Sequence, residues 1–232
     1  EITVIPGWIT ELSSLNSAER KRIVKLAKQV NLALPAIAAH TNLLARDPKE
    51  HAQNLQRLKG AVDLAVDWAI DGHLPCIDTT AGGAPDEYAT VKALLVERLN
   101  ELVDYAKTRG VVIALEPHVG AAINTPQRVL EVLHLVNSPY LKLNFDISHF
   151  NVVGYSIEES VAACGPHSAH THIKDERGIF PDHEFLIPGE GVFDYVKYLK
   201  EMQKVGYQGF ISPEISIMVQ RRPNYDPLAA AT

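Results

Sequence analysis

Short β-branched and apolar runs alternate along this chain with longer amphipathic segments. The runs that predict strands cover residues 2–5, 33–38, 74–78, 111–116, 141–146, 168–173 and 210–214. Between them, apolar positions that recur every three to four residues predict helices over 17–31, 48–71, 86–109, 126–137 and 192–205. Strands that alternate with helices in this way are typical of βα units around a parallel sheet.

Several of the predicted helices carry boundary signals. Asp47 precedes Pro48, and Thr125 precedes Pro126, so a capping side chain stands before a first-turn proline in both places. Gly110 follows the segment 86–109 and is a helix-ending residue. These signals place the helices between the strand runs and support the βα reading.

The strand count points to a barrel. Seven strands are predicted, whereas a (β/α)₈ TIM barrel has eight. The chain opens directly in a strand, and residues 226–232 read as the first turn of a helix. We therefore expect a TIM barrel that lacks its first βα unit and most of its last helix in this sequence, forming a single domain over 1–232. A genuine seven-stranded or open barrel is the alternative.

Composition excludes several classes of protein. A hydrophobic fraction of 46% and a charged fraction of 22% are those of an ordinary globular domain. The net charge of −6 argues against a nucleic-acid partner, which requires clustered Lys and Arg. No apolar run approaches the roughly 20 residues that span a bilayer, so no membrane partner is expected. Cys76 and Cys164 lie far apart without metal spacing, which favours a reducing compartment, and we expect the cytoplasm.

The most informative chemistry lies at the ends of the predicted strands. Four strand runs end on or beside a residue that binds metals: Glu116, Asp146, His172 and Glu214. Each of these has a structural explanation when taken alone, because a strand-end carboxylate can cap the next helix. The carboxyl ends of parallel barrel strands converge on one mouth, however, where active sites lie. Three carboxylates and one imidazole together predict a site for one hard-to-borderline divalent cation.

Five stretches of the chain carry a further signal: Leu115-Glu116-Pro117-His118, Asn144-Phe145-Asp146-Ile147-Ser148-His149, His170-Thr171-His172-Ile173-Lys174-Asp175, Pro188-Gly189-Glu190-Gly191 and the segment from Gly206 to Glu214. Together they resemble the xylose isomerase-like TIM-barrel superfamily, the group of sugar phosphate isomerases and epimerases that includes D-tagatose 3-epimerase. The resemblance extends from about the second barrel strand to the start of the eighth helix.

The resemblance implies a metal-dependent reaction on a small sugar or sugar derivative. In that group one Mn²⁺, Mg²⁺, Co²⁺ or Zn²⁺ ion is bound, here by Glu116, Asp146, His172 and Glu214, with Mn²⁺ the expected ion. The two glutamates would also carry protons. The implied activity is isomerisation or epimerisation by proton abstraction next to a carbonyl, through a metal-stabilised enediolate.

The same resemblance suggests the substrate contacts. His149 and Arg177 would bind substrate oxygens, although a loop histidine and a solvated arginine are the simpler interpretations. Lys174 is a further candidate contact, and a lysine after a strand is commonly only solvated. His40 and Trp8 are placed to line a sugar pocket at the barrel mouth. The oligomeric state is open: a homo-oligomer or a small partner subunit would both be compatible.

His118 keeps a second reaction open. It lies two residues after Glu116, and some relatives use such a histidine as an acid or base, notably the barrel subunit of C-glycoside deglycosidases. The alternative function is therefore a metal-dependent lyase or deglycosidase subunit that cleaves 3-oxo-glycosides by β-elimination. A histidine that only orders the loop is equally compatible with the sequence. A third class, a non-catalytic sugar-binding protein, is disfavoured by the complete ligand set.

A DNA-repair nuclease is not expected, although endonuclease IV shares this barrel and binds three zinc ions. His40 could match one ligand of that enzyme, but the next strand end offers Asp78 where the nuclease has a histidine. The segment 179–187 also lacks the Asp-x-His pair at the expected distance. The negative net charge points the same way.

Overall fold

Seven parallel strands form one sheet in the computed structural model, which describes residues 1–230. In spatial order they are β1 (Ile2–Thr3), β2 (Ala36–Ala38), β3 (Cys76–Thr80), β4 (Ile113–Glu116), β5 (Leu141–Asp146), β6 (Ser168–Ile173) and β9 (Ile211–Pro213). Each overlaps one predicted strand run. Within residues 1–230, β1 and β9 form the two unpaired edges of the sheet, which is therefore an open barrel.

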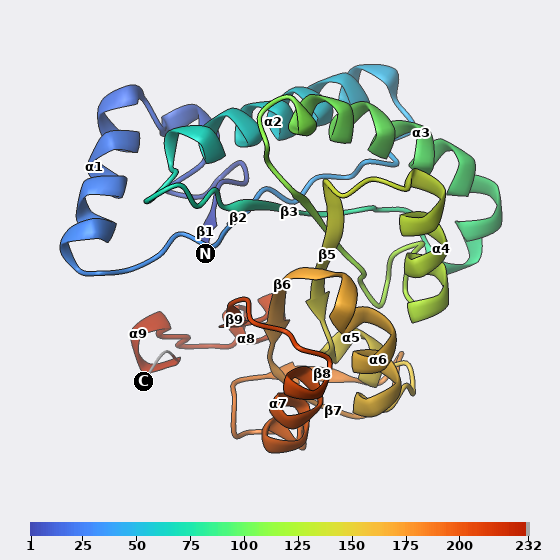
Figure 1. The fold of residues 1–232 in the computed structure, drawn as a ribbon. Coiled ribbons are helices and arrows are strands. Elements are labelled where there is room, and N and C mark those ends of the chain that lie inside the picture. The colour runs from blue at the N-terminus through green and yellow to red at the C-terminus, as the bar shows by residue number, and fades with distance from the viewer. Residues whose placement is uncertain (231–232) are drawn as a thin grey trace.

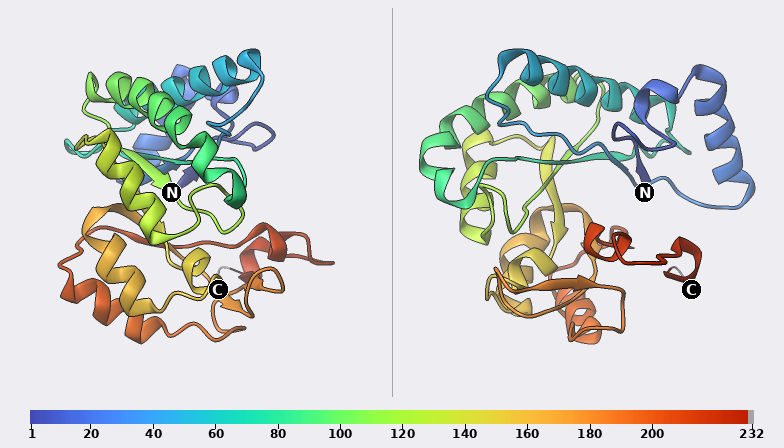
Figure 2. Two further views of the ribbon diagram at one scale, coloured as in Figure 1. Left: turned by 90° about the vertical axis from the view of Figure 1, so that its right-hand side faces the viewer. Right: turned by 180° about the vertical axis from the view of Figure 1, so that it is seen from behind.

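Helices surround this sheet. The longer ones are α1 (Ser17–Gln29), α2 (Pro48–Asp67), α3 (Tyr88–Lys107), α4 (Pro126–Val136), α6 (Ile157–Cys164) and α7 (Tyr195–Lys204). The short ones are α5 (Ser148–Asn151), α8 (Ile217–Gln220) and α9 (Pro227–Ala230), with 3₁₀ turns at Leu12–Ser14, Pro85–Glu87 and Gly165–His167. Figure 1 shows α1 to α4 around the first half of the sheet and α5 to α7 around the second half, and Figure 2 shows the same grouping from the side and from behind.

The helix starts follow local capping chemistry. Asp47 accepts the N–H groups of Lys49 and Glu50 at the start of α2, and Thr125 accepts that of Arg128 at the start of α4. Both predicted caps are confirmed. Helix α6 was missing from the sequence prediction, although Ser156 and Glu159 form a reciprocal capping box at its start.

The two faces of the sheet differ in character. Ile37, Ile77, Leu115 and Phe145 are fully buried and belong to the main apolar cluster with the surrounding helices. The alternate positions face inward and are small, since Ala36, Cys76 and Ala114 form a separate cluster. Side chains two residues apart on a strand point to the same face. The next residues on the inward face lie two positions further along each strand, toward its carboxyl end. Asp78 follows Cys76 in this way, Glu116 follows Ala114, Asp146 follows Asn144 and His172 follows His170.

A hairpin lies between β6 and α7 in the chain and forms a second, two-stranded sheet. It consists of β7 (Asp175–Arg177) and β8 (Glu184–Leu186), paired antiparallel. The amino-terminal end of the strands instead surrounds a cavity of about 960 Å³, with Leu34, Leu74, Val112 and Phe210 among its lining residues. In barrels of this kind the chemistry lies at the carboxyl ends. No helix within residues 1–230 is long and apolar enough to cross a membrane.

Candidate metal centre

The four predicted ligands meet at the carboxyl ends of their strands. Glu116 and Asp146 are the last residues of β4 and β5, His172 lies in β6 opposite Asp146, and Glu214 follows β9. One ligand atom from each of the four lies within 4.8 Å of the others. The Nδ1 atom of His172 is 3.3 Å from Glu116 Oε1 and 3.9 Å from Glu214 Oε2.

Lys174 provides the positive charge among these carboxylates. Its Nζ lies 2.5 Å from Asp146 Oδ2 and also pairs with Glu214. The lysine side chain is only 3% exposed, so it is not the solvated residue that a lysine after a strand usually is. Burial alone would raise the pKa of Asp146 and of Glu214, but the Lys174 ammonium and the neighbouring His172 together outweigh it and lower both pKa values. Burial likewise opposes the charge of Lys174, and the carboxylates raise its pKa.

The remaining oxygen of Asp146 is held by the backbone and a hydroxyl. Oδ1 accepts the Ser148 N–H at 3.0 Å and the Ser148 hydroxyl at 2.6 Å. The carboxylate is therefore oriented with Oδ2 toward the other ligands. Three carboxylate oxygens and one imidazole nitrogen, converging in a buried place, fit a divalent ion such as Mn²⁺, Mg²⁺ or Zn²⁺.

Two further histidines lie beside this cluster. His149, which is buried in α5, places Nε2 3.4 Å from Lys174 Nζ and 3.5 Å from Asp146 Oδ2. The ring of His118 lies against it with the centroids 4.0 Å apart. Burial lowers the pKa of both imidazoles, and nearby Lys174 lowers that of His149 further, which favours the neutral form of both rings. Neither substrate binding by His149 nor catalysis by His118 is tested by this arrangement, and both stay predictions.

His40 adjoins the cluster on the other side, through a partner that the sequence analysis did not assign. Its Nε2 lies 2.7 Å from Asp78 Oδ2 and 3.7 Å from Glu116 Oε2. Burial works against protonation of His40, but the Asp78 carboxylate outweighs it and raises the pKa of His40 to about 10. Burial also raises the pKa of Asp78, to about 6. Asp78 lies two residues after Cys76 and therefore points to the same inward face of the strand, which is the sequence signal that indicates this contact.

Within residues 1–230, two predicted substrate residues contact other parts of the chain and not the ligand cluster. Arg177 pairs with Glu184 across the hairpin, with Nη2 2.5 Å from Oε2, and its side chain is 59% exposed. Trp8 lies after β1 with about half of its surface exposed, and its backbone N–H donates to Ile5. Their roles in substrate binding stay predictions.

Asp175 anchors the loop that follows the hairpin. Its carboxylate accepts the backbone N–H groups of Glu176, Gly189, Gly191 and Phe193 at 2.8–3.0 Å. A Cβ atom at Gly191 would lie 2.3 Å from Asp175 Oδ1, so this close approach requires glycine. The loop is thereby fixed to the strand segment that carries His172 and Lys174.

Comparison with known proteins agrees with this architecture. The family model described as xylose isomerase-like TIM barrel matches residues 6–230. The inosose isomerase of Bacillus licheniformis is 30% identical over 209 residues, which cover 86% of this chain and 70% of the relative. The fructoselysine 3-epimerase of Shigella flexneri is 26% identical over 211 residues, covering 88% of this chain and 75% of that protein.

A solved structure shares the fold. The crystal structure of an IolI protein with a bound zinc atom has a TM-score of 0.68 and 24% identity, covering 83% of this chain and 72% of that one. The chain thus belongs to the xylose isomerase-like TIM-barrel family, whose named relatives here are an isomerase and an epimerase.

Proposed function

We propose that this protein is a divalent-metal-dependent isomerase or epimerase that acts on a small keto-sugar or polyol ketone. The observation that carries the proposal is the convergence of Glu116, Asp146, His172 and Glu214, with one ligand atom from each within 4.8 Å of the others. Isomerase and epimerase names among the relatives support the reaction class. Mn²⁺ is the proposed ion, with Mg²⁺, Co²⁺ and Zn²⁺ as alternatives of suitable chemistry.

The reaction requires removal of a proton next to a carbonyl group. A divalent cation held by the four ligands supplies a positive charge for the negative charge that develops on the substrate oxygen. Glu116 and Glu214 are the proposed proton carriers. Glu116 ends β4 and Glu214 follows β9, and these strands are separated in the sheet by β5 and β6, which supports a role for the two carboxylates on opposite sides of the substrate. Such flanking acids can remove a proton at one carbon and return it at another position.

The other residues hold the site and the substrate. Asp146 and His172 would bind the cation without exchanging protons. Lys174 and His149, which touch each other beside Asp146, would bind substrate oxygens, and the His40–Asp78 pair would do so on the side of Glu116. Arg177 and Trp8 are proposed as outer contacts for a bound sugar.

A lyase is the second candidate, favoured by one contact. The His118 ring lies against His149, which in turn touches Lys174 beside Asp146. This contact supports a role in which the neutral His118 imidazole first accepts the proton from the carbon next to the 3-oxo group and then donates it to the leaving group. The proposed substrate is then a 3-oxo-glycoside, cleaved by β-elimination.

Product masses distinguish the two reactions. The purified protein, loaded with Mn²⁺, is incubated in D₂O with inososes, ketohexoses and a 3-oxo-glycoside. Isomerisation conserves the heavy-atom composition and adds deuterium, whereas elimination splits the glycoside into two products. Glu116→Gln and Glu214→Gln should each abolish turnover while the fold persists by circular dichroism, and the exposed Glu50→Gln should keep its turnover. Wild-type turnover in either site variant would contradict the assignment.

A further inference from the structure

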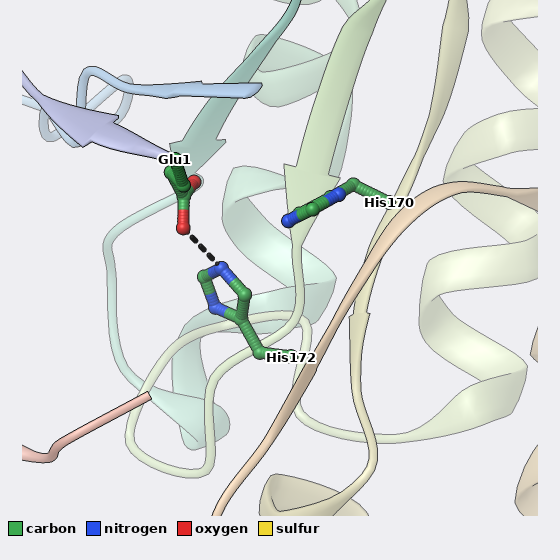
Figure 3. A group of neighbouring side chains, drawn as sticks. All are labelled: Glu1, His170 and His172. Carbon is green, nitrogen blue, oxygen red and sulfur yellow. Dashed lines mark hydrogen bonds and ion pairs between the residues drawn. The ribbon is translucent and has the colours of Figure 1, made fainter. Parts of the chain in front are cut away.

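His172 contacts carboxylates through both of its ring nitrogens. Nδ1 faces the ligand cluster, 3.3 Å from Glu116 Oε1, whereas Nε2 lies 2.6 Å from Glu1 Oε2. Figure 3 shows Glu1 pointing at the imidazole from the side of β1. Because β1 and β6 are separated in the sheet by four other strands, this contact crosses the interior of the open barrel.

The two side chains are largely shielded from water, although Glu1 as a whole residue is exposed. The side chain of His172 is 3% exposed and that of Glu1 is 15% exposed. A carboxylate in such a place is stabilised only if it accepts a hydrogen bond from a good donor. An imidazole with its proton on Nε2 supplies that donor, and the 2.6 Å distance is typical of a hydrogen bond to a charged acceptor.

We propose that Glu1 is a positioning residue for the cation site. A neutral imidazole carries one N–H and one lone pair, and a metal binds the nitrogen that has the lone pair. By accepting a hydrogen bond from Nε2–H, Glu1 keeps the proton on Nε2 and leaves the lone pair of Nδ1 directed at Glu116, Asp146 and Glu214. The hydrogen bond to the carboxylate also makes the imidazole more basic, so that its Nδ1 lone pair binds a cation more strongly. This inference rests on the proposed metal-dependent function.

A neighbouring histidine offers a competing interpretation. Glu1, His170 and His172 also bring one ligand atom each within 4.8 Å of one another. A cation there would need His172 Nε2, which carries the proton once Nδ1 coordinates the ion of the main site. His170 contacts Ser212 Oγ through Nε2 at 3.0 Å and meets the His172 ring edge-on. Its Nδ1 has no hydrogen-bond partner within residues 1–230, so it is the protonated His172 Nε2 that disfavours a second ion. The geometry therefore favours orientation of His172 over a second ion.

Metal titration of a charge-only variant tests the proposal. Glu1→Gln keeps an acceptor oxygen but removes the negative charge, and we expect the Mn²⁺ dissociation constant to rise about 10- to 100-fold with a stoichiometry of one. Glu1→Asp, which keeps the charge on a shorter side chain, should weaken binding less. Glu50→Gln removes one carboxylate from an exposed position on α2 and should bind Mn²⁺ as the wild type does.

A second readout reports the tautomer directly. In the Zn²⁺-loaded wild type, ¹⁵N NMR should show the proton of His172 on Nε2, and the signal of that N–H should shift or exchange faster in Glu1→Gln. If the wild type binds Mn²⁺ and the dissociation constant of Glu1→Gln lies within twofold of the wild-type value, the role of Glu1 is overturned and the proposed function is not. Two ions in the wild type and one in Glu1→Gln would show a second cation site instead. Absence of binding in the wild type would overturn the proposed function itself.

Discussion

Lys174 Nζ lies 2.5 Å from Asp146 Oδ2 and also contacts Glu214, so one buried ammonium touches two of the four proposed metal ligands. The same two carboxylates would be shared with a divalent cation. The lysine thus neutralises part of the negative charge of the ligand carboxylates, and a bound cation would neutralise part of the same charge.

This relationship predicts a metal-dependent effect of Lys174→Met. In the metal-free protein the substitution leaves buried carboxylates without their partner, and we expect a loss of about 3 kcal/mol or more in the free energy of unfolding. In the presence of saturating Mn²⁺ the loss should be smaller, because the cation supplies the missing positive charge. Urea unfolding with chelator and with Mn²⁺ measures both values. Equal losses under the two conditions would show that Lys174 and the cation do not share the carboxylates.

Glu176 predicts a pH-dependent stability. It is buried, and this burial raises the pKa of its carboxyl from 4.5 to about 7, against a hydrogen bond from Asn151. Between these pH values the folded state keeps a proton that the unfolded state has lost, so stability falls as the pH rises through this window. Glu176→Gln has no such proton. Its stability relative to the wild type should increase by on the order of 3 kcal/mol from pH 4.5 to pH 8.

Chemical denaturation at a series of pH values measures this difference. The low-pH data serve as the reference for the effect of the substitution on packing. A difference between Glu176→Gln and wild type that does not change with pH would mean that the Glu176 carboxyl ionises normally in the folded protein.

Asp175 predicts a localised loss of order. Asp175→Ala would leave the backbone N–H groups of Gly189, Gly191 and Phe193 without their acceptor, and we expect a destabilisation on the order of 3 kcal/mol. Hydrogen exchange at these three amides should become faster in Asp175→Ala than in the wild type, whereas exchange in β4 and β5 should stay unchanged. Asp182→Ala, in the exposed turn of the same hairpin, is the matched control and should leave the three amides protected. Unchanged exchange in Asp175→Ala would refute the anchoring role.

Much of the fold follows from local sequence signals. Residues that alternate at period two, such as Asn144 with Asp146 and His170 with His172, fix both the strands and their inward face. The helix starts at Pro48 and Pro126 follow from caps within one turn. For this reason the four proposed ligands were found from the sequence, since each is defined by its own strand.

The contacts between these elements were not predictable in the same way. The His40–Asp78 pair joins a residue that lies two positions after β2 to a residue of β3, and β3 continues two residues beyond the predicted strand end at Asp78. The hairpin was missed because Gly178 and Pro181 interrupt any alternating pattern. Its attachment depends on Asp175, whose hydrogen-bond partners lie up to 18 residues away. Lys174 was assigned to substrate or solvent because nothing in its local sequence shows the carboxylates of β5 and β9.

Direct titration of the wild-type protein with Mn²⁺ is the measurement that tests the central claim, that four strand-end residues form one cation site. Isothermal calorimetry, after treatment with a chelator, should show one saturable ion per chain. Asp146→Asn and His172→Ala should each weaken binding at least 10-fold, and Glu50→Gln should not. Absence of saturable binding to the folded wild type, or unchanged affinity in both site variants, would contradict the account.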